Sequence, residues 1–168
     1  MYDSGSGKEE SPYPLNYDEI IARYDEIIAR AAHLDLDVSV PGVLPDRRLH
    51  ITRLTIIDAF NVVRLEYEII PLNEPPSPES AEVSRAYGPW SWMVGGRDDR
   101  RTVYDDRGGT YGVPPNGLVA DGDRDLFPAP PSDATWLEIT IHFGDPDVSD
   151  PVYTLKMDLP LRPPSADC

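Results

Sequence analysis

The nine residues TWLEITIHF, at positions 135–143, carry an apolar side chain at every second position from Leu137 onward. Because successive side chains of a β-strand point to opposite faces, this alternation predicts a strand with one buried and one wet face. After the turn residues Gly144–Asp147, the same pattern returns in Tyr153–Leu159. The two segments indicate an antiparallel pair of strands near the end of the chain.

Three earlier segments alternate in the same way, namely Leu34–Val40, Leu49–Ile57 and Asn61–Ile70. The dipeptide Pro41-Gly42 is expected to end the first of them. The alternation of the second slips near Arg53, which predicts a β-bulge at that point.

The middle of the chain holds shorter segments. Trp90–Val94 alternates ahead of Gly95-Gly96, and Asp125–Phe127 is expected to form a short edge strand. Thr102–Asp105 and Thr110–Val113 flank Asp106–Gly109, which has the residue types of a hairpin turn.

Many short strands without interleaved helices predict a mostly β fold. We expect an antiparallel immunoglobulin-like β-sandwich of about seven or eight strands, with one N-terminal amphipathic helix. The expected organisation is a flexible lead at 1–15, the helix at 16–32, the sandwich domain at 33–160 and a flexible tail at 161–168.

The helix is predicted by two identical consecutive heptads, YDEIIAR at 17–23 and again at 24–30. Asn16 and Glu19 have the spacing of a capping box at its start. Its apolar stripe consists of Tyr17, Ile20, Ile21, Tyr24, Ile27 and Ile28 and extends to Ala31. The stripe requires a covering surface, which is the protein's own sandwich, a second copy of the chain or another protein. The last two make the stripe a candidate partner-binding site.

Net charge narrows the range of partners. Thirty acidic residues against fifteen basic ones give a net charge of −15, which repels phosphate backbones and anionic lipid surfaces. We therefore expect no nucleic-acid and no membrane partner. The segment 1–14 has no apolar stretch typical of a signal peptide, so a cytoplasmic location is expected.

Acidic clusters raise the question of calcium. The weak metal-ligand candidates are Asp121, Asp123, Asp125, Asp145 and Asp147. Carboxylates on loops suit Ca²⁺, but the first cluster has Leu126 where an EF-hand loop needs glycine and Ser132 where it needs glutamate. Solvated turns are the simpler interpretation, and we expect no cofactor and no metal.

Residue types for catalysis are sparse. His33, His50 and His142 lack zinc-ligand spacing, Cys168 is the single cysteine, and no G-x-S-x-G motif is present. We expect no enzyme. Trp90 and Trp92, which share a face, are either core residues or a platform for a sugar or a protein.

Four segments, in their order along the chain, resemble a group of uncharacterised actinobacterial proteins with an immunoglobulin-like sandwich. They are Val62–Tyr67, Asp105–Tyr111, Phe127–Ala134 and Trp136–Ile139. The resemblance covers roughly residues 45–160 and implies a fold without a known activity. The function expected from the sequence is a non-enzymatic binding or protein-interaction module, and the alternative is a calcium- or carbohydrate-dependent recognition domain.

Overall fold

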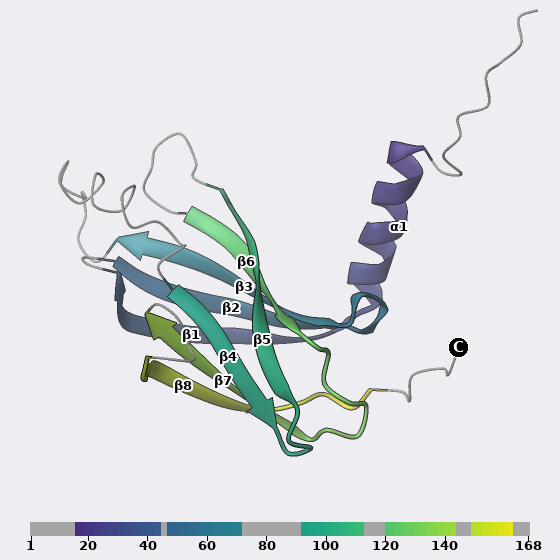
Figure 1. The fold of residues 1–168 in the computed structure, drawn as a ribbon. Helices are drawn as coiled ribbons and strands as arrows, with labels where there is room; N and C mark the ends of the chain where they lie inside the picture. The colour runs from purple at the N-terminus through teal and green to yellow at the C-terminus, as the bar shows by residue number, and fades with distance from the viewer. Residues whose placement is uncertain (1–15, 45–46, 72–91, 113–119, 144–148, 163–168) are drawn as a thin grey trace, which may run out of the picture. The chain divides into compact units, whose positions relative to one another are not determined.

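The computed structural model describes residues 16–44, 47–71, 92–112, 120–143 and 149–162 (Figure 1). Residues 1–30 and 31–168 form two separate compact units. The elements in chain order are α1 (Tyr17–Arg30), β1 (Ala32–Leu44), β2 (Arg47–Ile57), the short 3₁₀ turn η1 (Asp58–Phe60), β3 (Val62–Pro71), β4 (Trp92–Asp98), β5 (Val103–Gly112), β6 (Ala120–Phe127), β7 (Trp136–Phe143) and β8 (Pro151–Asp158).

Helix α1 begins with the predicted capping box. The Asn16 side chain accepts a hydrogen bond from the Glu19 amide at 2.9 Å, and the Glu19 carboxylate accepts one from the Asn16 amide at 3.1 Å. This reciprocal pair satisfies two amides that the first helical turn leaves without partners. The predicted helix and its cap are therefore confirmed.

The second unit is a single antiparallel sheet with the strand order β1-β2-β3-β6-β5-β4-β7-β8. The sheet coils until its two end strands, β1 and β8, approach each other, so the unit is a nearly closed barrel (Figure 1). The mostly β fold with eight antiparallel strands is confirmed. The expected two-sheet sandwich is wrong, because one strand, β5, joins the two halves.

Strand β5 runs straight through the predicted hairpin turn at Asp106–Gly109. Val103 and Tyr104 pair with β4, whereas the strand pairs with β6 from Asp105 onward. The turn-like residues instead form a β-bulge, where the register shifts between Asp106 and Gly109. Gly108 has φ 82°, a conformation that glycine adopts at low cost. The prediction of two short strands here is wrong for this reason.

Three other boundaries differ from the sequence prediction. Strand β6 lies in the middle of the sheet between β3 and β5, so it is neither short nor an edge strand. Strand β4 continues through Gly95-Gly96, and β1 continues past Pro41-Gly42. Trp90 and the loop predicted at 71–84 lie almost entirely outside the described residues.

The bulge predicted near Arg53 is confirmed. The pairing of β2 with β3 shifts register between Ile51 and Arg53. Before the shift, Leu49 and Ile51 are buried, and after it Leu54 and Ile56 are buried. Since a strand alternates strictly, the one extra residue keeps both halves of β2 facing the core.

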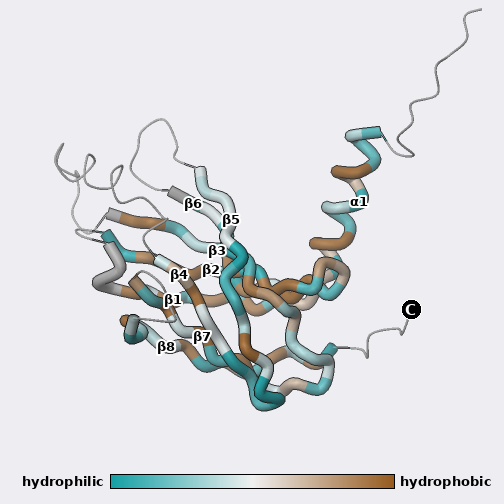
Figure 2. Tube along the Cα trace, in the orientation of Figure 1, coloured by the Kyte–Doolittle hydropathy of each residue, from teal (hydrophilic) through white to brown (hydrophobic). Residues whose placement is uncertain are grey.

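The barrel encloses one apolar core, to which every strand except β8 contributes fully buried or nearly buried side chains. Its members are Val40, Leu49, Ile51, Leu54, Ile56, Val63, Leu65, Tyr67, Ile69, Trp92, Val94, Tyr104, Leu126, Leu137, Ile139 and Ile141. β8 adds the half-buried Tyr153 and Met157. Figure 2 shows the corresponding alternation of brown and teal along the strands.

Two buried carboxylates hold β4 to β5. Asp98 accepts hydrogen bonds from the amides of Arg100 and Thr102 and from the Tyr104 hydroxyl, the last at 2.7 Å. It thereby closes the turn that leads from β4 into β5. Buried carboxylates are stable only when their oxygens are bonded in this way.

Asp106 acts further along, where β5 leaves β4 for β6. Its Oδ2 accepts the Val94 amide of β4 at 2.9 Å and the Arg124 guanidinium of β6 at 2.6 Å, and its Oδ1 accepts the Gly108 amide. One side chain thus connects three strands. Arg124 also stacks on Trp92, with its guanidinium carbon 4.6 Å from the ring centre.

Replacing Asp106 by alanine is expected to destabilise the barrel by about 3–5 kcal/mol, because it leaves the Arg124 charge buried and two amides unpaired. The measurement is the free energy of unfolding from denaturant titration. The neighbouring and exposed Asp105 is the matched control, and Asp105→Ala should change stability by no more than about 0.5 kcal/mol. Equal effects of the two variants would contradict the role given to Asp106.

Candidate functional site

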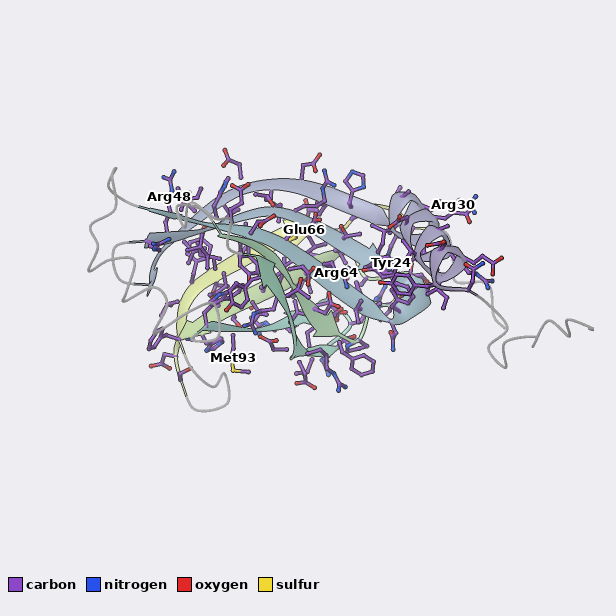
Figure 3. All side chains as sticks on the ribbon, turned by 90° about the horizontal axis from the view of Figure 1, so that it is seen from above. Tyr24, Arg30, Arg48, Arg64, Glu66 and Met93 are labelled. Atoms are coloured by element: carbon purple, nitrogen blue, oxygen red, sulfur yellow. The ribbon has the colours of Figure 1, made fainter. Side chains whose placement is uncertain are left out.

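The first candidate surface is the apolar stripe of α1, defined by Tyr17, Ile20, Ile21, Tyr24, Ile27 and Ile28. Helix α1 buries none of its residues. Tyr17 is 75% exposed, Ile20 51%, Ile21 42% and Tyr24 38%. Figure 2 shows brown, hydrophobic bands that alternate with teal along α1, and Figure 3 labels Tyr24 on this helix.

Charged residues border the stripe on both sides. At 100° per residue, Asp18 and Asp25 follow one long edge of the stripe, and Arg23 and Arg30 follow the other. Arg30 forms an i,i+4 ion pair with Glu26, in which both side chains are exposed. Such an exposed pair contributes little to stability, so Arg30 can exchange it for a contact with a bound partner at low cost.

The second candidate surface is a groove of about 590 Å³ on the outside of the barrel, over β2, β3, β6 and β5. Its acidic side chains come from two facing strands. Glu66 of β3 lies directly opposite Asp123 of β6, and Glu68 lies opposite Asp121. Tyr111 and Thr110 of β5 also line the groove.

Like charges that lie directly opposite on neighbouring strands repel each other. The barrel offsets part of this repulsion. Arg53 lies 3.6 Å from the Glu66 carboxylate, and Thr110 donates to the Asp123 carboxylate through its amide and its hydroxyl. The groove nevertheless remains an acidic surface.

Tyr67 forms part of the groove wall from the core side. Its hydroxyl donates to the Thr110 carbonyl at 3.4 Å, and its ring meets that of Trp92 edge-on at 4.9 Å. Burial raises the pKa of Tyr67 to about 12, although the positive charge of Arg124 acts in the opposite direction. Tyr67 therefore stays a neutral hydrogen-bond donor over the physiological range.

A smaller depression of about 460 Å³ lies over β4, β5 and β7 and includes Thr140 and His142. His142 is buried, with Nδ1 2.9 Å from the Ser149 carbonyl and Nε2 3.0 Å from the Thr140 hydroxyl. Because a carbonyl oxygen only accepts, Nδ1 donates to Ser149, while the Thr140 hydroxyl holds the other ring nitrogen. Met93, labelled in Figure 3, lies on the same outer face.

Three of the five aspartates predicted as weak metal ligands lie in strand β6. Asp121, Asp123 and Asp125 alternate along strand β6, whereas Asp121 and Asp123 were expected in a solvated turn and Asp125 at the start of a short strand. Asp125 forms a two-pronged ion pair with Arg64, at 2.8 and 2.9 Å, and Arg64 is labelled with Glu66 in Figure 3. Asp145 and Asp147 lie outside the described residues. Among the residues that the structure describes, no three acidic, histidine or cysteine side chains are placed to hold a metal ion.

Trp92 is a core residue, so it offers no platform for a sugar. The two histidines other than His142 lie at the wet side of their strands, with His33 exposed and His50 close to the carboxylates of Asp37 and Glu68. Asp98 and Asp106 belong to an acidic cluster that is visible in the sequence, but their bonds within the barrel, and the role of Arg124, were not predicted. The only available signal was alternation, which places Arg124 on the same face of β6 as the buried Leu126.

Comparisons with known proteins add little to this picture. No family model and no curated protein matches the chain. One solved structure, a conserved domain protein from Bacillus anthracis, is similar over 77% of this chain, with 12% sequence identity and a TM-score of 0.42. This chain spans 47% of that protein. A likeness at this level carries no argument, and kinship with immunoglobulin-like actinobacterial proteins stays a prediction.

In the part of the chain that the structure describes, no helix is long and apolar enough to cross a membrane. The cytoplasmic location expected from the sequence is not tested by this finding.

Tyr67 and Tyr104 are expected to make the barrel sensitive to alkali. Burial, and for Tyr104 also the hydrogen bond to Asp98, raises the pKa of both hydroxyls above the ordinary value of 10.0. Their stabilising contribution is complete below pH 10 and is lost as the pH rises toward the folded-state pKa, about 12 for Tyr67.

The measurement is the free energy of unfolding between about pH 8 and about pH 12. This range includes the ordinary pKa of tyrosine and the raised pKa of Tyr67. The double variant Tyr67→Phe/Tyr104→Phe should show a shallower loss over this range, and Tyr17→Phe, at an exposed position of α1, serves as control. Identical slopes in all three proteins would contradict the assignment.

Proposed function

We propose that this protein is a non-enzymatic, cytoplasmic protein-interaction module and that the apolar stripe of α1 is its docking surface. One observation carries the proposal. The barrel has a core of its own, while α1 belongs to a separate unit and leaves four large apolar side chains of the stripe exposed.

Energetics support a covered state of the stripe. Fully burying one isoleucine-sized side chain is worth roughly 1.5–3 kcal/mol, so the stripe holds enough apolar surface to drive a specific association. A helix of 14 residues is also close to the lower limit of stability in water. A partner that packs on the stripe would stabilise the helix and at the same time remove the apolar side chains of the stripe from water.

The buried polar groups of the barrel support a non-enzymatic assignment. Asp98, Asp106 and Arg124 bond to one another's strands, and His142 is held by Thr140 and Ser149. These hydrogen bonds hold neighbouring segments of the barrel together. The polar atoms that make them are therefore already engaged and are not positioned to act on a substrate.

The proposal predicts that Ile20→Asp/Ile27→Asp abolishes docking and leaves the barrel intact. Ala22→Asp/Ala29→Asp is the matched control, because it adds the same charge on the opposite, exposed side of α1. Both variants should keep the melting temperature of the parent barrel within about 2 °C. Docking is measured by photo-crosslinking in the cells that express the protein, with benzoylphenylalanine incorporated in place of Tyr24.

The expected crosslinked bands disappear in the stripe variant and persist in the control. A fall in barrel melting temperature in the stripe variant alone would mean that the stripe belongs to the folded core, and it would overturn the proposal. Persistence of the bands in both variants would contradict it as well.

The outer-face groove supports a second candidate function, a calcium- or carbohydrate-dependent recognition domain. Asp121 and Asp123, two of the aspartates singled out in the sequence, line the groove together with Glu66, Glu68 and the 38%-exposed ring of Tyr111. Carboxylate acceptors beside an aromatic face suit a sugar. Hard oxygen donors suit Ca²⁺, but no three of the described acidic side chains are placed to hold a metal ion, so the groove supports the carbohydrate part better.

Calorimetric titration with Ca²⁺ tests the metal part of this candidate. A saturable heat that is lost in Asp121→Asn/Asp123→Asn, and retained in the exposed control Asp158→Asn, would support it. No heat and no thermal shift in the parent protein would remove calcium from consideration.

A further inference from the structure

We infer that the surface covering the α1 stripe is the α1 stripe of a second copy, with the two helices parallel. The inference rests on the proposed function and names its partner. It is carried by the charges that border the stripe and by the identity of the two heptads.

The two borders of the stripe carry opposite charges, and Glu26, the ion-pair partner of Arg30, lies further around the helix from the stripe. Asp18 and Asp25 lie along one edge, and Arg23 and Arg30 along the other. When two helices pack face to face and parallel, the edge on one side of the first helix meets the opposite edge of the second. Each arginine border then faces the aspartate border of the partner helix.

The antiparallel arrangement gives the reverse result. Each edge then meets the same edge of the partner, so aspartates face aspartates and arginines face arginines. Like charges that face each other across the interface destabilise the helix pair, whereas opposite charges stabilise it. The borders therefore select the parallel orientation and also disfavour its alternative.

The repeat of the heptad reinforces this match. Positions 17–23 and 24–30 are identical, so the borders and the tyrosine and isoleucine layers recur at the same spacing in both halves. In a parallel, in-register pair every layer meets its own copy. Two heptads make a short interface, so the association is expected to be weak and dependent on concentration.

The net charge of −15 opposes the approach of two copies. At physiological ionic strength, however, charges separated by more than about 8 Å are largely screened. The border charges lie within contact distance in the associated state, and the apolar stripe is buried between them. The attraction between the borders therefore acts at contact distance, while most of the repulsion between the two net charges is screened.

The test begins with the full chain carrying Cys168→Ser, so that introduced cysteines are the only thiols. Sedimentation equilibrium over roughly 5–500 µM should show reversible association by mass action. Ile20→Asp/Ile27→Asp should be monomeric throughout, and Ala22→Asp/Ala29→Asp should associate like the parent.

Orientation is read by disulfide formation. Tyr17→Cys should couple to itself, because parallel helices bring both N-terminal ends together. In an antiparallel pair, Tyr17→Cys would instead couple to Ile28→Cys, about 16 Å further along the helix. Faster coupling between positions 17 and 28 than between two copies of position 17 would overturn the inference.

Charge reversal tests the borders themselves. Arg23→Glu/Arg30→Glu makes both borders acidic and should weaken association about tenfold or more. Adding Asp18→Lys/Asp25→Lys to that variant exchanges the two borders, restores opposite charges across the interface and should recover most of the loss. Failure of the exchange to recover any association would contradict the role of the borders.

The two proposals fail in different ways. A parent chain that stays monomeric at every concentration, while position 24 still crosslinks in cells through an intact stripe, overturns self-association and leaves docking to another protein in place. A stripe variant with a destabilised barrel overturns both.

Discussion

The carboxylate of Asp106 is the contact on which the shape of the barrel depends. Strand β5 pairs with β4 only at Val103 and Tyr104, and it then turns toward β6. Past that point β5 no longer pairs with β4, and the Asp106 side chain accepts the Val94 amide in place of a β5 carbonyl. The same carboxylate forms a 2.6 Å ion pair with the buried guanidinium of Arg124.

The apolar core of the barrel is formed by the strands alone, without residues of α1. Because the eight strands bury their apolar residues against one another, the barrel has a complete core of its own. The apolar residues of α1 form a distinct surface with ordered charges on its two borders. Under the proposed function, the stripe of α1 is the docking surface and the acidic groove over β3 and β6 is the second candidate.

Local pattern was sufficient for much of the fold. The capping box at Asn16 and Glu19, the strands at both ends of the chain and the β2 bulge near Arg53 all follow from spacing and alternation. The architecture did not follow, because Asp106–Gly109 has the same residue types whether it makes a turn or a bulge. Only pairing with β6, more than a dozen residues away, decides between them. The structural roles of Asp98, Asp106 and Arg124 were not predicted for a related reason, since a charged residue in a strand gives no local sign that its partner lies on another strand.

Native-state hydrogen exchange, resolved by residue with NMR, tests the central claim most directly. If the Asp106 carboxylate replaces a strand partner, the Val94 and Gly108 amides that it accepts should exchange as slowly as those of the flanking strand pairs, opening only with the whole barrel. Rapid exchange at these two amides, in a barrel whose other strands remain protected, would show that β4 and β5 separate independently. That result would contradict the account.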